Sequence, residues 1–344
     1  MPLLVEPLGL LHGPAATQAI AEGLALPLAG GPSAFALVRL VDEGAAPGRI
    51  CPVAAVPAAF RAALVRVSAA PPPWAGMPAD RPLVMGILNV TPDSFSDGGA
   101  HADADRAIEA GLEMAAEGAD LVDVGGESTR PRAAPTPPDE ECARVVPVIR
   151  ALAARGVAVS VDTRNAATMR AALAAGARVV NDVSALAHDP DAAGVVAEAA
   201  CPVILMHMRG DPATMHTQAR YDDVAVEVTR ELAARIAAAE AAGIRRAAIA
   251  VDPGIGFAKA AAENLALLPR LSLLLNLGCP IVVGVSRKGF IGGLAGEPVA
   301  RRRGPGSLAA GLHAALHGAA MLRVHDVAAT AQAVRVWRGL LGLG

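Results

Sequence analysis

One pattern repeats eight times after Pro82, and this repeat limits the fold more than any other feature of the 344-residue chain. Each repeat begins with a short run of Val, Ile, Leu and Ala, continues through a polar cluster and ends in a helical stretch. Such apolar runs are typical of parallel strands that are buried on both faces. The eight runs are residues 83–88, 120–124, 157–161, 177–180, 202–206, 247–251, 280–285 and 320–324. The helical stretches are residues 103–117, 138–155, 166–175, 190–199, 222–242, 261–275, 307–318 and 327–341.

Eight β-α units in the stretch 83–344 predict a closed (β/α)8 barrel, that is, a TIM barrel of the α/β class. An open doubly wound sheet is the alternative, but it needs a Gly-x-Gly-x-x-Gly turn or a break in the repeat, and the sequence has neither. Three of the helical stretches end against a glycine, as the position after a helix prefers; these are Gly118, Gly156 and Gly243.

The first 82 residues do not follow the repeat. Residues 71–82 are rich in proline and are predicted to be a linker, because such a stretch sustains neither a helix nor a central strand. Residues 1–70 are predicted to form a small N-terminal extension with a strand at 34–41 and a helix at about 58–67. They carry no chemical motif, and two roles stay open: contact with the outer wall of the barrel, or extension of a dimer interface.

Composition excludes several partners. A net charge of −3 argues against a protein that binds nucleic acid, since such proteins concentrate positive charge. The longest stretch without a charged residue, 304–322, contains Pro305 and four glycines and is a poor membrane span. The N-terminus lacks the basic region of a signal peptide, so we expect a cytoplasmic protein. The four cysteines lie far apart in the sequence and are expected to be free thiols.

Polar residues follow every predicted strand. In a barrel of this kind the active site lies where the strands end, so these side chains should meet at one mouth. They are Asn89, Asp123, Asp162, Asn181, Asp182, His207, Asp252, Lys288, Arg323 and His325. Any one of them could instead be a helix cap or a loop residue, and this alternative stays open for Asp123 and Asp182.

Two kinds of group are expected at this mouth. Hydrogen-bond acceptors suit the paired N–H donors of a flat heterocycle, whereas cations and donors suit phosphate oxygens. The first kind is Asp162, Asn181 and Asp252; the second is Thr129, Arg130, Lys288, Arg323 and His325. The simplest ligand is therefore a flat nitrogen heterocycle that carries a phosphate ester. No Ser-His-Asp or Cys-His arrangement indicates covalent acyl transfer.

Lysine is unusually rare in this chain. Of the 30 lysine and arginine residues, only Lys259 and Lys288 are lysines, and both lie in predicted strand-end loops. We infer that a compact ammonium is needed at these places and that a guanidinium cannot replace it. Chance placement is the alternative, and it is harder to exclude for Lys259.

Eight motifs together resemble those of the dihydropteroate synthases. They occur in the family's order over residues 83 to about 340, and each falls at a predicted strand end. They are GILNVTPDSFSDGG (86–99), DVGGESTRP (123–131), SVDT (160–163), NDVSAL (181–186), LMHMRGDPATM (205–215), DPGIGF (252–257), GVSRK (284–288) and RVHDV (323–327).

The resemblance implies a homodimeric enzyme of folate biosynthesis that is a target of sulfonamides. It would join p-aminobenzoate to 6-hydroxymethyl-7,8-dihydropterin diphosphate with Mg²⁺, releasing pyrophosphate and 7,8-dihydropteroate. By position, Asp162, Asn181 and Asp252 would hold the pterin edge with Lys288 and Met206, and Asn89 would contact the Mg²⁺–diphosphate. Thr129, Arg130, Arg323 and His325 would cradle the diphosphate. The catalytic set implied is Asn89, Thr129, Arg130, Lys288, Arg323 and His325, and the other substrate contacts are Phe95, Pro131, Phe257 and Gly284.

Three residues depart from the family pattern. Ala258 and Arg132 stand where glycine is usual, and Gly289 stands where serine or a larger residue is frequent. Gly289 is expected to begin a helix whose N–H groups bind the aminobenzoate carboxylate. Affinity for aminobenzoate or sulfonamides is therefore where a difference is expected first.

Two other functions are compatible with part of this pattern. A corrinoid-linked methyltransferase that binds methyltetrahydrofolate would share the pterin contacts but need no diphosphate site. A non-catalytic pterin-binding protein would lose the anion site. The NVTPDSFSDGG and GGESTRP loops favour the synthase over the methyltransferase. The presence of the anion-site residues favours it over the non-catalytic protein; these are Thr129, Arg130, Lys288, Arg323 and His325.

Overall fold

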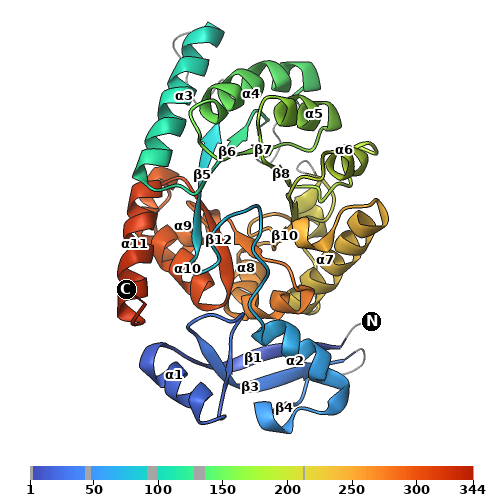
Figure 1. Cartoon of the computed structure of the whole chain (residues 1–344), viewed down its shortest axis with the longest axis vertical. Helices are drawn as coiled ribbons and strands as arrows, with labels where there is room; N and C mark the ends of the chain where they lie inside the picture. The colour runs from blue at the N-terminus through green and yellow to red at the C-terminus, as the bar shows by residue number, and fades with distance from the viewer. Residues whose placement is uncertain (1–2, 43–47, 91–98, 128–135, 212–213, 344) are drawn as a thin grey trace.

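The computed structural model describes residues 3–42, 48–90, 99–127, 136–211 and 214–343. Eight parallel strands close into a barrel in the order β10-β11-β12-β5-β6-β7-β8-β9, which confirms the predicted (β/α)8 fold (Figure 1). The strands are β5 (Leu83–Asn89), β6 (Leu121–Gly125), β7 (Val159–Asp162), β8 (Val179–Asp182), β9 (Val203–Met206), β10 (Ile249–Asp252), β11 (Ile281–Val283) and β12 (Ala319–Val324).

Helices surround the barrel at nearly the predicted places. They are α3 (Gly99–Glu117), α4 (Pro138–Ala153), α5 (Ala166–Ala174), α6 (Ala192–Ala199), α7 (Val224–Ala241), α8 (Ala261–Leu267), α9 (Gly289–Ala295), α10 (Gly304–Leu316) and α11 (Val327–Leu340). The prediction of one continuous helix over 261–275 is wrong. α8 ends at Leu267 and a 3-10 segment, η6 (Leu268–Leu277), follows, because Pro269 lacks an N–H donor and the chain kinks at Arg270.

The N-terminal extension is richer in structure than one strand and one helix. Its antiparallel sheet contains β1 (Leu4–Leu11), β2 (Leu26–Pro27), β3 (Ala34–Val41) and β4 (Ile50–Pro52), with α1 (Gly13–Ala21) and α2 (Arg61–Ser68) beside it. The sequence prediction missed β1 because Pro7 and Gly9 interrupt its pattern. Pro7 is tolerated because β1 pairs only with β3 and lies at the sheet edge.

The extension docks on η6 through buried polar contacts. The Asn276 side chain accepts a hydrogen bond from the backbone N–H of Val5 at 3.0 Å and donates one to the carbonyl of Val5 at 2.8 Å. Glu6 is 2% exposed and forms an ion pair with Arg270 at 2.7 Å. The extension therefore lies against the outside of the barrel, beneath the orange segments of Figure 1.

The linker closes one end of the barrel. Trp74 is 5% exposed and its indole N–H donates to the carbonyl of Ala248 at 2.9 Å. Its ring belongs to a separate apolar cluster with residues near the beginnings of the strands: Leu83, Met85, Leu121, Val179, Ile204, Ala250, Val282 and Met321. Trp74 therefore covers the end where the strands begin, and the opposite end, where the strands finish, carries the polar side chains.

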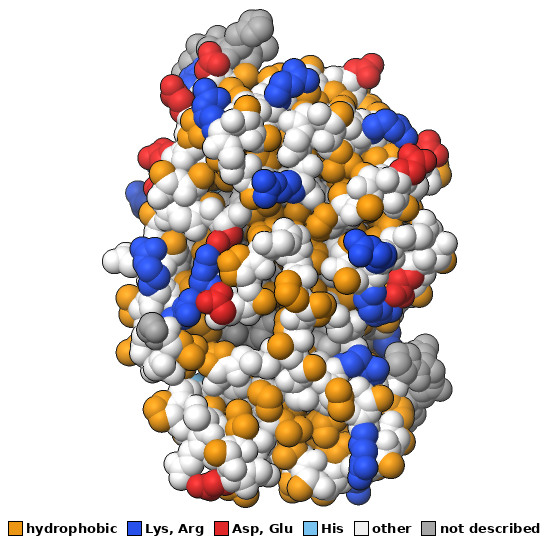
Figure 2. Space-filling view, in the orientation of Figure 1, with side chains coloured by type: hydrophobic (Ala, Val, Ile, Leu, Met, Phe, Trp, Pro, Cys, Tyr) orange, Lys and Arg blue, Asp and Glu red, His pale blue; other side chains and the backbone are white. Residues whose placement is uncertain are grey.

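Three further features of the described residues bear on the partners and the cysteine chemistry expected. On the face shown in Figure 2, basic and acidic side chains are interspersed, while apolar side chains gather over the lower part of the molecule. No described helix combines the length and apolar character needed to cross a bilayer. All four cysteines are free, as predicted.

Candidate active site

Parallel pairing brings the strand ends to one level. Asn89 lies opposite Gly125 of β6, Gly125 opposite Asp162 of β7, and Asp162 opposite Asn181 of β8. On the other side of the barrel, Asp252 of β10 lies opposite Met206 of β9. The residues predicted to bind the pterin therefore share one mouth.

Asp123 is the buried centre of this mouth. It is fully buried and accepts hydrogen bonds from the Ser160 hydroxyl at 2.6 Å and the Asn181 amide at 3.0 Å. Arg323 Nε donates to the same carboxylate at 2.7 Å. Because the Asn181 amide nitrogen is engaged, its oxygen stays available as an acceptor. Asp123 therefore orients two predicted site residues, and the alternative of a simple loop residue is wrong.

Asp182, in contrast, stabilises its own loop. Its carboxylate accepts from the backbone N–H of Ser184 at 2.6 Å and of Leu186 at 2.9 Å. These bonds hold Ala185 and Leu186 at positive φ. The loop alternative is correct here.

Arg323 joins the two sides of the mouth. Besides Asp123, it donates through Nη2 to Asp162 at 2.7 Å. Burial raises the pKa of Asp162 to about 7, and the charge of Arg323 opposes this rise. The residue predicted to bind phosphate thus touches a residue predicted to bind the pterin edge, and the two kinds of group form one site.

Gly284 leaves space between the side chains of Asp252 and Arg323. Asp252 is 7% exposed and accepts from the backbone N–H of Gly254 at 2.7 Å. Burial raises its pKa, while Lys288 and Arg323 act in the opposite direction. A Cβ at Gly284 would lie 3.9 Å from both the Asp252 carboxylate and the Arg323 Cβ. The missing side chain therefore leaves room between the acidic and basic groups.

Lys288 and Phe257 meet at the rim. The Lys288 ammonium lies 4.3 Å from the centre of the Phe257 ring, within cation–π distance. Burial lowers the pKa of Lys288 to about 8. Gly256 lets the two approach, since a Cβ there would lie 3.3 Å from Lys288 Cδ.

His325 is a neutral donor in this setting. Burial first, and then the charges of Arg287 and Arg323, lower its pKa to about 4. Its Nδ1 lies 3.0 Å from the Ser286 hydroxyl, which already accepts from the backbone N–H of His325. In the tautomer in which Nδ1 accepts from this hydroxyl, Nε2–H is left to donate to a ligand.

Some predicted residues fall outside the described part of the chain. These are Phe95, Thr129, Arg130, Pro131 and Arg132. Among the described ones, Met206 is 4% exposed and lines a cavity of about 540 Å³ with Arg164, Ser184 and Arg235. Asn89 is half-buried at the end of β5.

The sequence placed Asp123 at the mouth but left its role open, although a further signal was present. Asp123 lies inside the apolar run 120–124 rather than after it. A carboxylate in a strand buried on both faces requires partners, because an unpaired buried charge is costly. The sequence alone therefore predicts that Asp123 has hydrogen-bond partners, but it does not predict which residues they are.

The barrel and the polar residues at its mouth are those of a (β/α)8 enzyme that binds a heterocycle bearing phosphate. Similarity to known proteins identifies the family within this class. Residues 85–325 match the family model described as "Pterin binding enzyme". The dihydropteroate synthase of Mycobacterium leprae is 49% identical over 259 residues, which cover 74% of this chain and 91% of that protein. That of Neisseria meningitidis serogroup C is 46% identical, covering 76% and 93%. The chain belongs to the dihydropteroate synthase family.

Solved structures agree with this assignment. Dihydropteroate synthase from Xanthomonas albilineans, solved with 4-aminobenzoic acid, is 51% identical, with a TM-score of 0.73 and coverage of 77% of this chain and 95% of that one. The same enzyme has been solved with 7,8-dihydropteroate. Since the family match begins at residue 85, the N-terminal extension is additional to the conserved barrel.

Proposed function

We propose that the chain condenses 6-hydroxymethyl-7,8-dihydropterin diphosphate with p-aminobenzoate to give 7,8-dihydropteroate and pyrophosphate. The observation that carries this proposal is the Arg323 guanidinium, which contacts Asp123 and Asp162 in the mouth shared with Asp252. Relatives solved with 4-aminobenzoic acid and 7,8-dihydropteroate support the same substrate and product.

In this proposal the pterin edge binds Asp252, Asp162 and Asn181. The carboxylates accept from the N–H groups of the ring, and Asp123 holds the Asn181 amide in the matching orientation. Met206 contacts the ring from β9, and Gly284 leaves the space that the ring enters.

The diphosphate is bound on the basic side. Arg323 uses one N–H on Asp123 and one on Asp162, which leaves its other N–H groups for phosphate oxygens. His325 adds a neutral donor, and Lys288 adds a compact charge. Thr129 and Arg130 complete the cradle in this proposal, and Phe95, Pro131 and Phe257 enclose the aminobenzoate.

The reaction breaks the bond between the pterin methylene carbon and a diphosphate oxygen. It forms a carbon–nitrogen bond to p-aminobenzoate, and the amine loses one proton. The electron-rich pterin stabilises positive charge on the methylene, and an aromatic amine is neutral at pH 7. The site therefore acts through positioning and through cations that stabilise the departing oxygens, without a strong general base.

Asn89 fits a role beside Mg²⁺. Its amide is half-buried at the end of β5, and no group of three acidic, histidine or cysteine side chains among the described residues could hold a metal alone. Mg²⁺ keeps several waters and takes few protein ligands, so one amide oxygen and the substrate phosphates suit it. When bound, the ion neutralises charge on the departing pyrophosphate.

Sulfonamide binding and homodimerisation are part of the proposal. A Yersinia pestis relative has been solved as a sulfonamide drug complex, and sulfonamides resemble the aminobenzoate substrate.

At Gly289 an added Cβ would meet nothing within 4 Å, so the departure from serine leaves open space at the start of α9.

The test is direct. Purified full-length chain is mixed with the pterin diphosphate, p-aminobenzoate and Mg²⁺, and dihydropteroate and pyrophosphate are measured together. We expect both products in equal amounts, and Asp252→Asn should weaken pterin binding at least about tenfold because an amide presents a donor where an acceptor is needed. Absence of product at high enzyme concentration would reject the synthase and favour a non-catalytic pterin-binding protein.

A further inference from the structure

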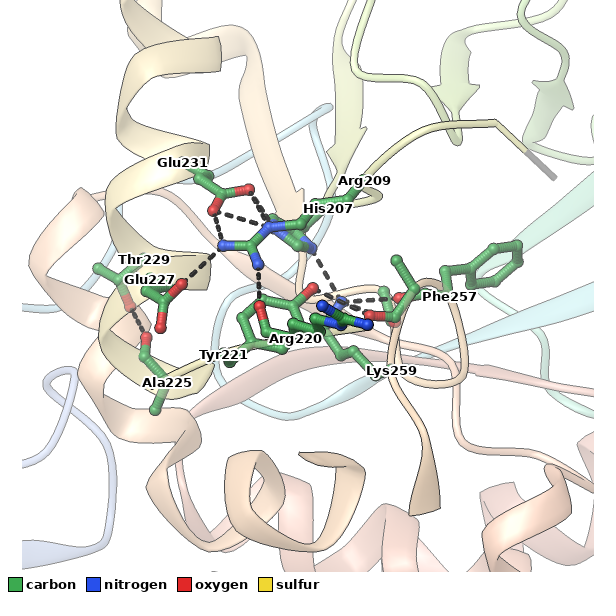
Figure 3. Close-up of polar contacts among 12 residues, drawn as sticks. His207, Arg209, Arg220, Tyr221, Ala225, Glu227, Thr229, Glu231, Phe257 and Lys259 are labelled. Atoms are coloured by element: carbon green, nitrogen blue, oxygen red, sulfur yellow. Dashed lines mark hydrogen bonds and ion pairs between the residues drawn. The ribbon is translucent and has the colours of Figure 1, made fainter. Parts of the chain in front are cut away.

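We propose that Lys259 is a positioning residue, which holds the loop between β10 and α8 so that Asp252 and Phe257 face the substrates. This inference rests on the proposed function, because the loop in question carries two of its substrate contacts. Lys259 itself lies behind the mouth, 6% exposed, in the cluster that Figure 3 shows.

The ammonium of Lys259 has three partners for its three N–H groups. It lies 2.8 Å from Nδ1 of His207, 3.1 Å from the carbonyl of Gly254 and 3.0 Å from the carbonyl of Phe257. All three partners accept, so the protonated ammonium satisfies a set that a neutral amine cannot, and this protonated form is the one the geometry selects although burial lowers the pKa of Lys259 to about 7. Two of the acceptors belong to the loop itself, and the third belongs to the residue after β9.

A chain of contacts anchors His207 in turn. Burial lowers the pKa of His207 to about 4, so the ring is neutral. Since Nδ1 accepts from Lys259, the proton is on Nε2, which donates to Glu231 of α7 at 2.9 Å. Although burial opposes it, hydrogen bonds from His207 and Arg209 lower the pKa of Glu231 to about 2, so Glu231 is a fixed anion.

A second branch from the same glutamate returns to the loop. Arg209 donates to Glu231 at 3.0 Å and lies 3.9 Å above the ring of Tyr221 (Figure 3). The Tyr221 hydroxyl donates to the carbonyl of Ala258 at 3.0 Å. The loop is thus held at Gly254, Phe257 and Ala258 by two branches that meet at Glu231.

This loop needs external support because its backbone is unusual. Gly254 and Gly256 have φ of +66° and +82°, and Ala258 has φ of +47°, in the left-handed region that disfavours a side chain. A Cβ at Gly254 would lie 2.0 Å from the carbonyl of His207, so the loop crosses directly over the end of β9. Alanine at 258, where the family pattern has glycine, increases the need for such support.

The support reaches the substrate side of the loop. The backbone N–H of Gly254 holds the Asp252 carboxylate at 2.7 Å, and the Phe257 ring contacts Lys288. In Figure 3 this ring projects away from the Lys259 cluster. Removing the ammonium takes the Lys259 donor from the Phe257 carbonyl and leaves the Gly254 carbonyl with only the backbone N–H of Phe257, at 3.0 Å. Gly254 and Phe257 should therefore shift, and pterin binding should weaken.

The experiment compares Lys259→Met and Lys259→Arg with a matched control, Arg246→Met. Arg246 lies just before β10, at the end of that strand opposite to Asp252, and forms a surface ion pair with Glu240. We expect both Lys259 variants to raise the KM for pterin diphosphate at least about tenfold, with a smaller effect on kcat, since His207 Nδ1 and the two loop carbonyls lose the hydrogen bonds from the ammonium. The planar guanidinium cannot supply three diverging donors in that space. The control should match wild type.

Tyr221→Phe is the milder second variant, because it removes only the hydroxyl that holds Ala258. It should raise the same KM by a few fold while the melting temperature stays close to that of wild type. Wild-type KM values in Lys259→Met or in Lys259→Arg would overturn the inference, and so would equal losses for both substrates that follow thermal stability alone. An inactive wild-type enzyme would refute the proposed function instead, so the two failures are distinguishable.

Discussion

Asp123→Asn isolates the charge of the buried carboxylate from its hydrogen bonds. The asparagine oxygen can still accept from Arg323 and Asn181, and its amide nitrogen can donate to Ser160, whose hydroxyl can rotate to accept. What is lost is the negative charge beside the Arg323 guanidinium. Hydrogen bonds to charged groups contribute about 1.5–3 kcal/mol and neutral ones about 0.5–1.5 kcal/mol, so the variant should lose about 1–2 kcal/mol of stability.

Asp123→Ala provides the larger reference change. It removes every acceptor at a fully buried position and leaves Arg323 with Asp162 alone, so the loss should approach about 3–5 kcal/mol. Urea unfolding followed by circular dichroism measures both values. Steady-state kcat/KM for the pterin diphosphate should fall about tenfold in Asp123→Asn, which corresponds to about 1.4 kcal/mol.

The pH profile separates this explanation from a general loss of structure. Burial is the main cause that raises the pKa of Asp162, and the charge of Asp123 contributes in the same direction. In Asp123→Asn the pKa of Asp162 should therefore fall, and the acid limb of kcat/KM should move to lower pH. Unchanged stability with an unchanged acid limb would refute the role assigned to Asp123, as would equal losses in the asparagine and alanine variants.

Three other perturbations test other parts of the molecule. Trp74→Ala should lower the free energy of unfolding by about 3–5 kcal/mol while kcat stays close to wild type, since Trp74 closes the end of the barrel away from the site; a lost kcat in folded protein would contradict this. His207 binds fewer protons when folded than when unfolded between pH 6.5 and its lowered pKa of about 4, so it should make stability fall as pH decreases through that window. His207→Asn keeps an acceptor for Lys259 and should flatten this fall in urea titrations at pH 4–7. Ala258→Gly should raise the melting temperature slightly, because relief of about 1 kcal/mol of left-handed strain exceeds the added chain entropy; a lower melting temperature would show that Ala258 is not strained.

Local pattern accounts for the parts of the fold that the sequence predicted. A strand buried on both faces reads as a continuous apolar run wherever it occurs, and the residue that ends it lies at the mouth by the geometry of a parallel barrel. Asp162, Asn181 and Asp252 could therefore be placed at one mouth without knowledge of any contact. The edge strand β1 was not predicted because it contains Pro7 and Gly9. Both are tolerated there, since β1 forms hydrogen bonds with β3 on one side only.

The connections within the site could not be predicted, because each joins distant segments. Asp123 accepts hydrogen bonds from residues 160, 181 and 323, and the sequence around position 123 does not predict which distant residues donate them. The rarity of lysine did mark Lys259 as unusual, but chance was an equally simple explanation until the structure supplied three acceptors around its ammonium. Three acceptors around one buried ammonium distinguish lysine from arginine, whereas a solvated charge does not. In an arginine-dominated chain, then, a retained buried lysine indicates a geometric requirement, and Lys259→Arg tests that requirement with the charge preserved.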